Sequence, residues 1–494
     1  MSADSAVTSA KSASLWAIAG SLGTRGLSFL FFMFIARTMS PSELGVMAMA
    51  LAVSVFADAL IDFGMSSQVI RHQTADDHHF FSGVLWLQMG IATASGLLIL
   101  SLSNWAASQY HEPRLQWALW GVCIASWFNA AGLVPHALLS RRLQHKSIAL
   151  RNTLATFVGG CIGLAMASAG QGVLALVVMH IANALTGVVT VWWAAHWRPI
   201  WLANWRTYLE AIRPVLIQAR HQLGTQLLEA VMVRLDQVLI GAVFGAATLG
   251  VYALAVRIFD VLFQVTCGPI ASVLLPYLAK VAGDAQQFRE RFLRVLNNVA
   301  LLAPPIYVCA ALYAGTGVKL IFGNQWEPAI PYLQWALGMG AVQAVGFVHS
   351  PAFMAIGKPD LNWWIAVISS MLWALGLLLL PQLAPIFAMI LWVGRSAVGL
   401  TLQVLFTQRL IDVRGRDYWR VVRGPLSGAA MVSTLAWATR HGDRLGAEPW
   451  LGMGIMLMTS LSLFAAMAWL FSADVRHFAS GIYGRWHHVQ IKSE

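Results

Sequence analysis

Long apolar runs separated by short polar loops make up almost the whole chain. Most runs are about 20 residues long, which is the length that an α-helix needs to cross about 30 Å of hydrocarbon. The pattern predicts an all-α integral membrane protein with about fourteen transmembrane helices. The spans are expected at 15–36, 44–64, 80–103, 116–138, 149–169, 172–196, 215–244, 249–275, 296–318, 329–356, 361–380, 385–408, 425–439 and 450–472.

Basic residues gather in alternate loops, and this predicts which loops face the cytoplasm. If the N-terminus is cytoplasmic, few of the 32 Lys and Arg residues fall in the outer loops. The basic residues of the outer loops are Arg37, Arg114, Lys319, Arg440 and Arg444. A miscounted helix would disturb the alternation in every later loop, so the pattern supports the span count. Both termini are therefore predicted to be cytoplasmic.

A segment between the sixth and seventh spans predicts a division into two halves. Trp197, Trp201 and Trp205 recur at helical spacing opposite basic residues, as in a helix that lies on the inner leaflet. The similar stretches 44–50 and 249–255 indicate an internal repeat. We expect two pseudo-symmetric six-helix bundles around a central cavity. The expected domains are an N-terminal bundle at 1–196, an interfacial cytoplasmic linker helix at 197–214, a C-terminal bundle at 215–408, and a cytoplasmic loop, two additional helices and a tail at 409–494.

Composition excludes several classes of function. Charged residues are 11% of the chain, compared with roughly 25% in soluble proteins. The net charge of +11 could suggest nucleic-acid binding, but the basic residues lie in short loops between spans, so no nucleic acid is expected. The chain has no P-loop motif and no G-x-S-x-G motif, and its outer loops are too short for a catalytic domain. These features indicate a carrier without a cofactor, and not an enzyme.

No pattern of cysteine or histidine indicates a metal site. Cys123, Cys161, Cys267 and Cys309 each fall inside an apolar run and lack zinc-site spacing, which predicts small core residues. His180 and His349 lie within spans without a second histidine or carboxylate three or four residues away. They are expected to be packed, hydrogen-bonded histidines.

Charged residues inside spans are the main candidates for function. Placing one at mid-bilayer costs about 2.5–3.5 kcal/mol on insertion scales. They are concentrated in spans one, two, seven and eight, which suggests a shared hydrophilic cavity. The candidates for substrate binding are Arg25, Arg234 and Arg257, and the candidate coupling or cavity acids are Asp58, Glu229, Asp236 and Asp260. Asp62 lies near the inner interface, and Arg395 is favoured as a structural or gating residue. The alternative is that such residues pair with one another and hold helices together, as Arg257 and Asp260 can at a spacing of three.

Several short motifs resemble those of the polysaccharide transporter family. They are Ala36–Gly45, Asp62–Gly64 followed by Arg71, Leu249 and Gly250 with Tyr252, Pro276, Ile321–Gly323 with Trp326, and Ala355–Pro359. Together with fourteen spans, they look like a Wzx-type flippase of the multidrug/oligosaccharidyl-lipid/polysaccharide export superfamily. The motifs are spread over most of the chain, although each is short.

The resemblance implies translocation of undecaprenyl-diphosphate-linked oligosaccharide repeat units across the bacterial inner membrane for O-antigen, capsule or exopolysaccharide synthesis. It also implies alternating access around a cavity lined by spans one, two, seven and eight. The implied partners are the lipid-linked glycan, the bilayer, and a polymerase with export machinery. Guanidinium groups bind phosphate oxygens in bidentate fashion, which suits Arg25, Arg234 and Arg257 to the diphosphate.

Two alternatives remain at this point. An ion-coupled drug or cation exporter of the same superfamily would need cation-binding acids without a basic counterweight. A membrane glycan polymerase or ligase would need a large outer loop.

Overall fold

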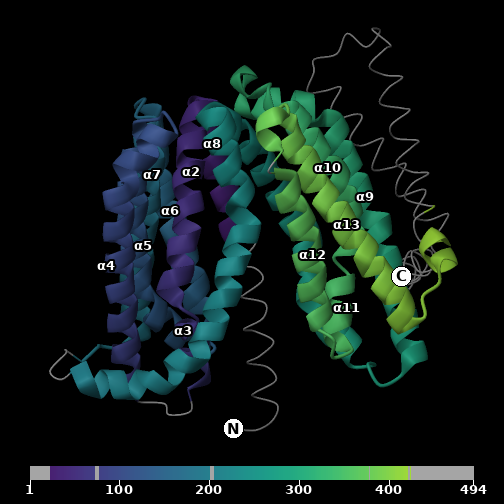
Figure 1. Ribbon diagram of the computed structural model, residues 1–494, viewed down its shortest axis with the longest axis horizontal. Coiled ribbons are helices and arrows are strands. Elements are labelled where there is room, and N and C mark those ends of the chain that lie inside the picture. The colour runs from purple at the N-terminus through teal and green to yellow at the C-terminus, as the bar shows by residue number, and fades with distance from the viewer. Residues whose placement is uncertain (1–22, 73–76, 201–204, 378, 421–422, 424–494) are drawn as a thin grey trace, which may run out of the picture. The chain divides into compact units, whose positions relative to one another are not determined.

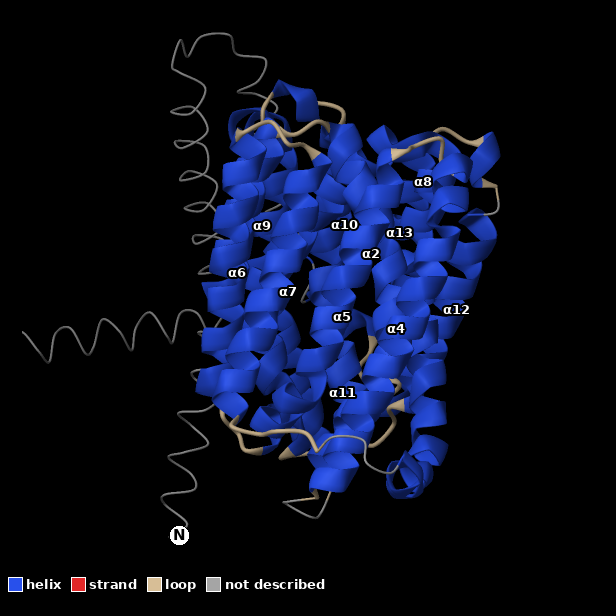
Figure 2. Cartoon of the chain, turned by 90° about the vertical axis from the view of Figure 1, so that its left-hand side faces the viewer, coloured by secondary structure: helices blue, strands red, loops and turns tan. Residues whose placement is uncertain are grey.

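The computed structural model describes residues 23–72, 77–200, 205–377, 379–420 and 423. This part of the chain is almost entirely helical and has no strand (Figure 2). Nine of its helices are long and apolar enough to cross a membrane. The all-α fold class is therefore confirmed. The predicted spans at 425–439 and 450–472 lie outside the described residues, so the total of about fourteen stays a prediction.

The helices follow the first twelve predicted spans in order (Figure 1). The first described helix covers residues 23–38. The labelled helices are α2 (Pro41–Asp62), α3 (Met65–Arg71), α4 (His78–Gln109), α5 (Arg114–Arg141), α6 (His145–Ser168), α7 (Val173–Ala195), α8 (Trp205–Ala279), α9 (Ala285–Phe322), α10 (Ala329–Gly346), α11 (His349–Ala355), α12 (Asp360–Leu377) and α13 (Ile386–Ile411). Two short 3₁₀ helices cover Asn324–Trp326 and Leu380–Gln382.

The start of α2 follows directly from its sequence. Ser40 is the N-cap, and its hydroxyl accepts a hydrogen bond from the backbone N–H of Glu43. The Glu43 carboxylate in turn accepts from the backbone N–H of Ser40 at 2.8 Å. Pro41 occupies the first helical position, where its missing N–H costs nothing. This capping box fixes the point at which the second span begins.

Two breaks in long helices differ in whether the sequence predicted them. Inside α8, Gly245 has φ 79° and ψ 178°, a conformation that favours glycine, and it separates spans seven and eight as expected. The predicted tenth span at 329–356 is interrupted in the structure, because α10 and α11 are separate helices on either side of Phe347 and Val348. Pro351 has no N–H for the carbonyl of Phe347, and its ring would collide with that carbonyl in a continuous helix.

Contacts between residues divide the chain into two compact units. Unit 1 comprises Met1–Leu254, Ile321–Trp326 and Leu380–Pro385, and unit 2 comprises Ala255–Leu320, Glu327–Leu379 and Ile386–Glu494. The boundary at Leu254 lies inside α8, whereas the sequence suggested a boundary at 197–214. The division into two six-helix bundles therefore stays a prediction.

In unit 1, α2, α4, α5, α6 and α7 run side by side (Figure 1). One core cluster of this unit contains Trp197, which is 5% exposed and stacks on Trp192 with ring centres 5.6 Å apart. Residues 197–200 are not helical, so the expected linker helix does not begin at Trp197. The side chains of the other two tryptophans in that expected stripe lie outside the described part.

Candidate functional site

The first two helices of unit 1 hold Arg25 and Asp58 in different surroundings. Arg25 is exposed and has no hydrogen bond or ion pair with any other described residue. Asp58 lies on α2 with part of its surface exposed, and its carboxylate accepts a hydrogen bond from the Ser126 hydroxyl of α5 at 2.9 Å. Arg25 is therefore open to a ligand, while Asp58 is held in place by a neighbouring helix.

Arg234 and Asp236 belong to one hydrogen-bonded network in unit 1. Arg234 donates from Nη1 to the side-chain oxygen of Gln237 at 3.0 Å, while its buried Nε has no acceptor among the described residues. Asp236 is 5% exposed and accepts from the backbone N–H of Gln237 and from the Tyr252 hydroxyl. Asp236 and Tyr252 lie on opposite sides of the break at Gly245. Asp236 therefore joins the two helical parts of α8, and Arg234 keeps one donor for a ligand.

The motif that begins at Asp62 forms the corner between α2 and α3. Phe63 and Gly64 have φ of 48° and 72°, so the chain makes a left-handed turn where a glycine fits best. The Asp62 carboxylate accepts from the hydroxyl and the backbone N–H of Ser66, and from the side-chain amide of Gln226 on α8 at 2.8 Å. These contacts make Asp62 a residue that ties α8 to this corner.

The remaining predicted charges are divided between the units. Glu229 is exposed on the part of α8 in unit 1, and Arg257 and Asp260 are exposed on the part in unit 2. Arg395 of α13 is half-buried, and its guanidinium carbon lies 5.1 Å from the centre of the Trp373 ring. A cation over an aromatic face is stabilised there, which fits the structural role predicted for Arg395.

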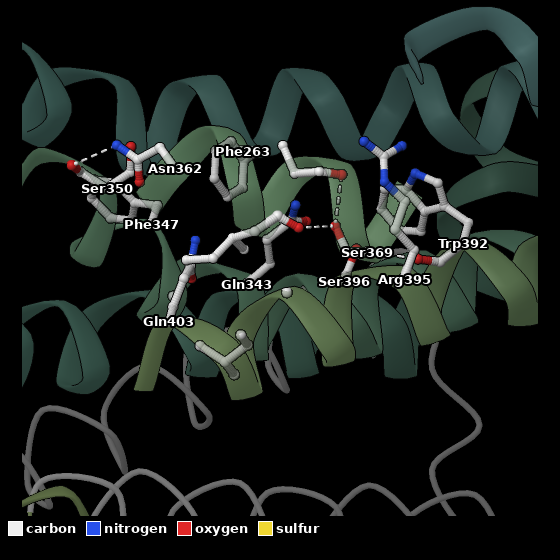
Figure 3. A pocket seen from close by; sticks show the side chains of 15 residues that line it. Phe263, Gln343, Phe347, Ser350, Asn362, Ser369, Trp392, Arg395, Ser396 and Gln403 are labelled. Carbon is white, nitrogen blue, oxygen red and sulfur yellow. Dashed lines mark hydrogen bonds between the residues drawn. The ribbon is translucent and has the colours of Figure 1, made fainter. Parts of the chain in front are cut away.

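A polar pocket of about 380 Å³ lies within unit 2, and we call it the unit 2 polar pocket (Figure 3). It is lined from α8, α10, α11, α12 and α13 and from Phe347. Its polar side chains are Gln343, Ser350, Asn362, Ser369, Arg395, Ser396 and Gln403, and its aromatic ones are Phe263, Phe347 and Trp392. Ionised residues within the spans do not indicate this pocket, because all but one of its polar side chains are uncharged. Neutral amides in apolar runs were the signal that could have found it.

Motif residues from distant parts of the chain meet in unit 1. A Cβ added to Gly45 would lie 1.7 Å from the carbonyl oxygen of Ala246, and one added to Gly250 would lie 1.8 Å from that of Pro41. The α2 and α8 backbones therefore touch at this crossing. Trp326 is fully buried and donates from Nε1 to the carbonyl of Ala36 at 2.8 Å. These contacts hold the scaffold together.

Ion pairs outside the predicted spans include one formed by Arg114 and one formed by Arg289. In the turn between α4 and α5, Arg114 donates to Glu112 at 2.7 Å, and this hydrogen bond lowers the pKa of the Glu112 carboxyl. Arg289 of α9 donates to Asp417 at 2.7 Å, and this hydrogen bond lowers the pKa of Asp417. The Arg114–Glu112 pair is exposed, where a single ion pair contributes little to stability, whereas the Arg289–Asp417 pair is partly buried.

His349 and the cysteines test smaller predictions. His349 is fully buried, and its ring nitrogens pair with the Gly346 carbonyl at 2.8 Å and the Tyr418 hydroxyl at 3.0 Å. The prediction of a packed histidine is confirmed there. Cys267 and Cys309 are buried as expected, but Cys161 is exposed. The prediction of a core position is therefore wrong for Cys161.

Comparison with known proteins identifies the family. Residues 34–331 match the family described as "Polysaccharide biosynthesis protein", which is more than half of the 494 residues. The chain belongs to this family. The resemblance to Wzx-type polysaccharide transporters is thereby confirmed.

This polysaccharide biosynthesis protein is similar to curated relatives over most of its length. It is 22% identical over 394 residues to the lipopolysaccharide biosynthesis protein WzxC of Escherichia coli (strain K12), covering 80% of this chain and 77% of that protein. It is 24% identical over 361 residues to the succinoglycan biosynthesis transport protein ExoT of Rhizobium meliloti (strain 1021), covering 72% and 70% of the two chains.

Solved structures with the same fold are membrane transporters. The inward closed lipid II flippase MurJ superposes with a TM-score of 0.74 at 11% identity, covering 93% of this chain and 99% of that one. An inward-facing multidrug resistance MATE family transporter superposes with a TM-score of 0.55 at 15% identity, covering 78% and 94%. At such low identity the likeness shows the fold alone. The polysaccharide biosynthesis protein is thus a multi-pass membrane protein with a MurJ-like fold.

Proposed function

We propose that this protein is a flippase that moves undecaprenyl-diphosphate-linked oligosaccharide repeat units across the bacterial inner membrane. The match of residues 34–331 to the polysaccharide biosynthesis family carries the proposal, since relatives in that family are named for polysaccharide biosynthesis and transport. The fold shared with a protein named as a lipid II flippase supports it. Both termini face the cytoplasm, as the loop charges predict.

In this proposal the arginines bind the diphosphate, which is the costly group to move through hydrocarbon. Arg25 is exposed without a described partner, and Arg234 keeps a buried Nε donor without an acceptor. Arg257 is exposed on the second part of α8. Guanidinium groups match phosphate oxygens in geometry and charge. The polyprenyl tail stays in the lipid while the sugars cross through the central cavity that the sequence predicts.

The carboxylates are proposed to couple transport to a proton or cation. Asp58, Glu229 and Asp260 are exposed and suited to this role. Asp236 is the weakest of the four, because its buried carboxylate already accepts hydrogen bonds from Tyr252 and from the backbone. The cargo crosses without covalent change, so no catalytic residue is assigned. A polymerase and export machinery receive the cargo on the outer face.

The decisive experiment is a flipping assay in proteoliposomes with defined lipid-linked oligosaccharides. The wild-type protein should flip them, and Arg25→Ala and Arg234→Ala should reduce the rate about tenfold or more, because a hydrogen bond to a charged group contributes about 1.5–3 kcal/mol. The Lys variants keep the charge without the planar fork and should fall between. Arg409→Ala, on the exposed end of α13, is the matched control and should flip normally.

The outcomes separate the function from the site. A wild-type protein that flips no lipid-linked glycan contradicts the proposed function. If the wild type flips and both Ala variants, inserted at normal level, flip equally well, the function stands and the diphosphate site is wrong. Flipping that is insensitive to both pH and ion gradients would remove the coupling role of the carboxylates.

A further inference from the structure

The unit 2 polar pocket is not used by the proposed diphosphate site, and its lining combines amides, hydroxyls and aromatic rings (Figure 3). It is lined from spans eight, ten, eleven and twelve, and polar side chains inside membrane spans are costly and almost always face the protein interior or a cavity. Its volume of about 380 Å³ is at the lower end of the range of roughly 300–1,000 Å³ for small-molecule sites. The pocket is therefore large enough to hold a small ring or a cluster of waters.

Hydrogen-bonding capacity in the pocket is left unused by the protein. The side-chain amides of Gln343 and Gln403 have no partner among the described residues, and the Gln343 oxygen is fully buried. Leaving a buried polar atom unpaired costs about 1–3 kcal/mol. The hydroxyls of Ser369 and Ser396 donate to carbonyls of their own helices, so their oxygens remain free to accept. The pocket thus presents donors and acceptors together.

The lining excludes two kinds of ligand. Among the described residues that line the pocket there is no carboxylate, so a metal ion would lack its preferred anionic oxygens. The lining has one guanidinium, that of Arg395, whereas a diphosphate favours several cations. Amides and hydroxyls that both donate and accept suit neutral hydroxyl groups. The rings of Phe263, Phe347 and Trp392 supply apolar faces for the C–H side of a sugar ring.

We propose that the unit 2 polar pocket binds one neutral glycosyl ring of the cargo, with Gln343 and Gln403 hydrogen-bonded to its hydroxyls. This inference rests on the proposed function, since it assigns a sugar subsite to the same cargo. It assigns sugar recognition to side chains of unit 2 that differ from the three arginines assigned to the diphosphate. Asn362 already donates to the Ser350 carbonyl at 3.2 Å, and this bond fixes the wall between α11 and α12.

The direct test is protection of a cysteine placed in the pocket. Ser350→Cys is introduced after replacement of Cys123, Cys161, Cys267 and Cys309, and its reaction with a methanethiosulfonate reagent is timed in nanodiscs. The probes are methyl glycosides of glucose, galactose and N-acetylglucosamine, with betaine at equal osmolarity as a solute that has no hydroxyl. At least one glycoside should slow the reaction about threefold or more, and betaine should not. The protection should vanish when Gln343→Leu and Gln403→Leu are added.

A second measurement uses the complete lipid-linked cargo, and it tests the pocket even where single sugars bind too weakly to protect the cysteine. In the flipping assay, Gln343→Leu should lower the rate about fivefold or more, because each lost hydrogen bond weakens cargo binding. The matched control is Gln334→Leu, an amide on the same helix outside the pocket, which should flip at the wild-type rate.

The two proposals fail in different ways. If the wild type flips no lipid-linked glycan but a glycoside still protects the cysteine, the proposed function is wrong and the sugar subsite stands. If the wild type flips, no glycoside protects, and Gln343→Leu flips at the wild-type rate, the pocket holds water alone and the inference is overturned.

Discussion

The crossing of α2 and α8 offers a sharp test of how the scaffold of unit 1 is held together. Gly45 lies in the first turns of α2, and a Cβ added there would be 1.7 Å from the carbonyl oxygen of Ala246. Gly250 mirrors it, with Pro41 in the place of Ala246. Close approach of membrane helices at small residues is a common way to pack without a hydrophobic driving force. Gly45→Ala removes the space that permits this approach.

The magnitude follows from two opposing effects. Carbon and oxygen atoms in weak contact lie about 3.3–3.6 Å apart, so the backbones would have to separate by about 1.6–1.9 Å. Overpacking of this kind costs about 1–3 kcal/mol. Replacing a helical glycine with alanine contributes about 0.5–1 kcal/mol in the other direction. The clash wins because the opposing atom belongs to a backbone carbonyl, which cannot rotate away. We expect a net destabilisation of about 1–2 kcal/mol.

The assay is thermal unfolding of the purified protein in detergent, combined with the flipping rate in proteoliposomes. Gly45→Ala and Gly250→Ala should each lower the unfolding temperature. Gly90→Ala on α4 is the control, because nothing lies within 4 Å of its added Cβ. That variant should be neutral or slightly more stable. If Gly45→Ala and Gly90→Ala unfold at the same temperature, the helices do not cross at Gly45 as described.

Three further predictions concern side-chain contacts that hold the scaffold together. Tyr252→Phe removes the hydroxyl that donates to buried Asp236 and should lower the unfolding free energy by about 1–3 kcal/mol, measured by thermal unfolding. Trp326→Phe loses its buried indole hydrogen bond and should cost about 1–2 kcal/mol in the same assay. Arg289→Gln removes the group that lowers the pKa of Asp417, so its destabilisation should be full near pH 7 and should shrink as the pH falls below about 4, where the carboxyl is protonated first in the unfolded chain and then, at its lowered pKa, in the folded protein. An equal effect at pH 3.5 and pH 7 would contradict that origin.

The spans could be predicted because hydrocarbon thickness imposes a single length on every apolar helix. The break inside α8 was also predictable, since Gly245 stands between two complete runs. The break in the tenth span was not predicted, because the apolar run continues through it. Pro351 removes the hydrogen bond of the carbonyl four residues earlier, so the break lies before the proline that causes it. Trp197 was misplaced because helical spacing of aromatics looks the same on a membrane surface and in a core.

The candidate site was predicted less completely, for a related reason. A search for ionised residues finds those that membranes tolerate poorly, and it found Arg25 and Arg234. Such a search does not show which of the charged side chains has a hydrogen-bond or ion-pair partner within the protein. The partner of Asp236 is Tyr252, 16 residues away and beyond a helix break, so no local spacing rule reveals it. Neutral amides such as Gln343 are not found by such a search. The free-energy cost of burying an amide in a membrane is smaller than that of a charge, and it depends on whether the amide has a hydrogen-bond partner.

The family-like motifs and the proposed sugar subsite are different sets of residues, and physical reasons separate them. Gly45, Gly250 and Trp326 each contact backbone atoms, whose positions are set by the fold and not by the side chains of the opposing residues. A contact with backbone therefore demands one residue type. Gln343 and Gln403 belong to none of the quoted motifs and face a space that a cargo would fill. A residue that contacts cargo must follow the chemistry of that cargo. This explains why short motifs could indicate the fold and the general class of function while they left the glycan undetermined.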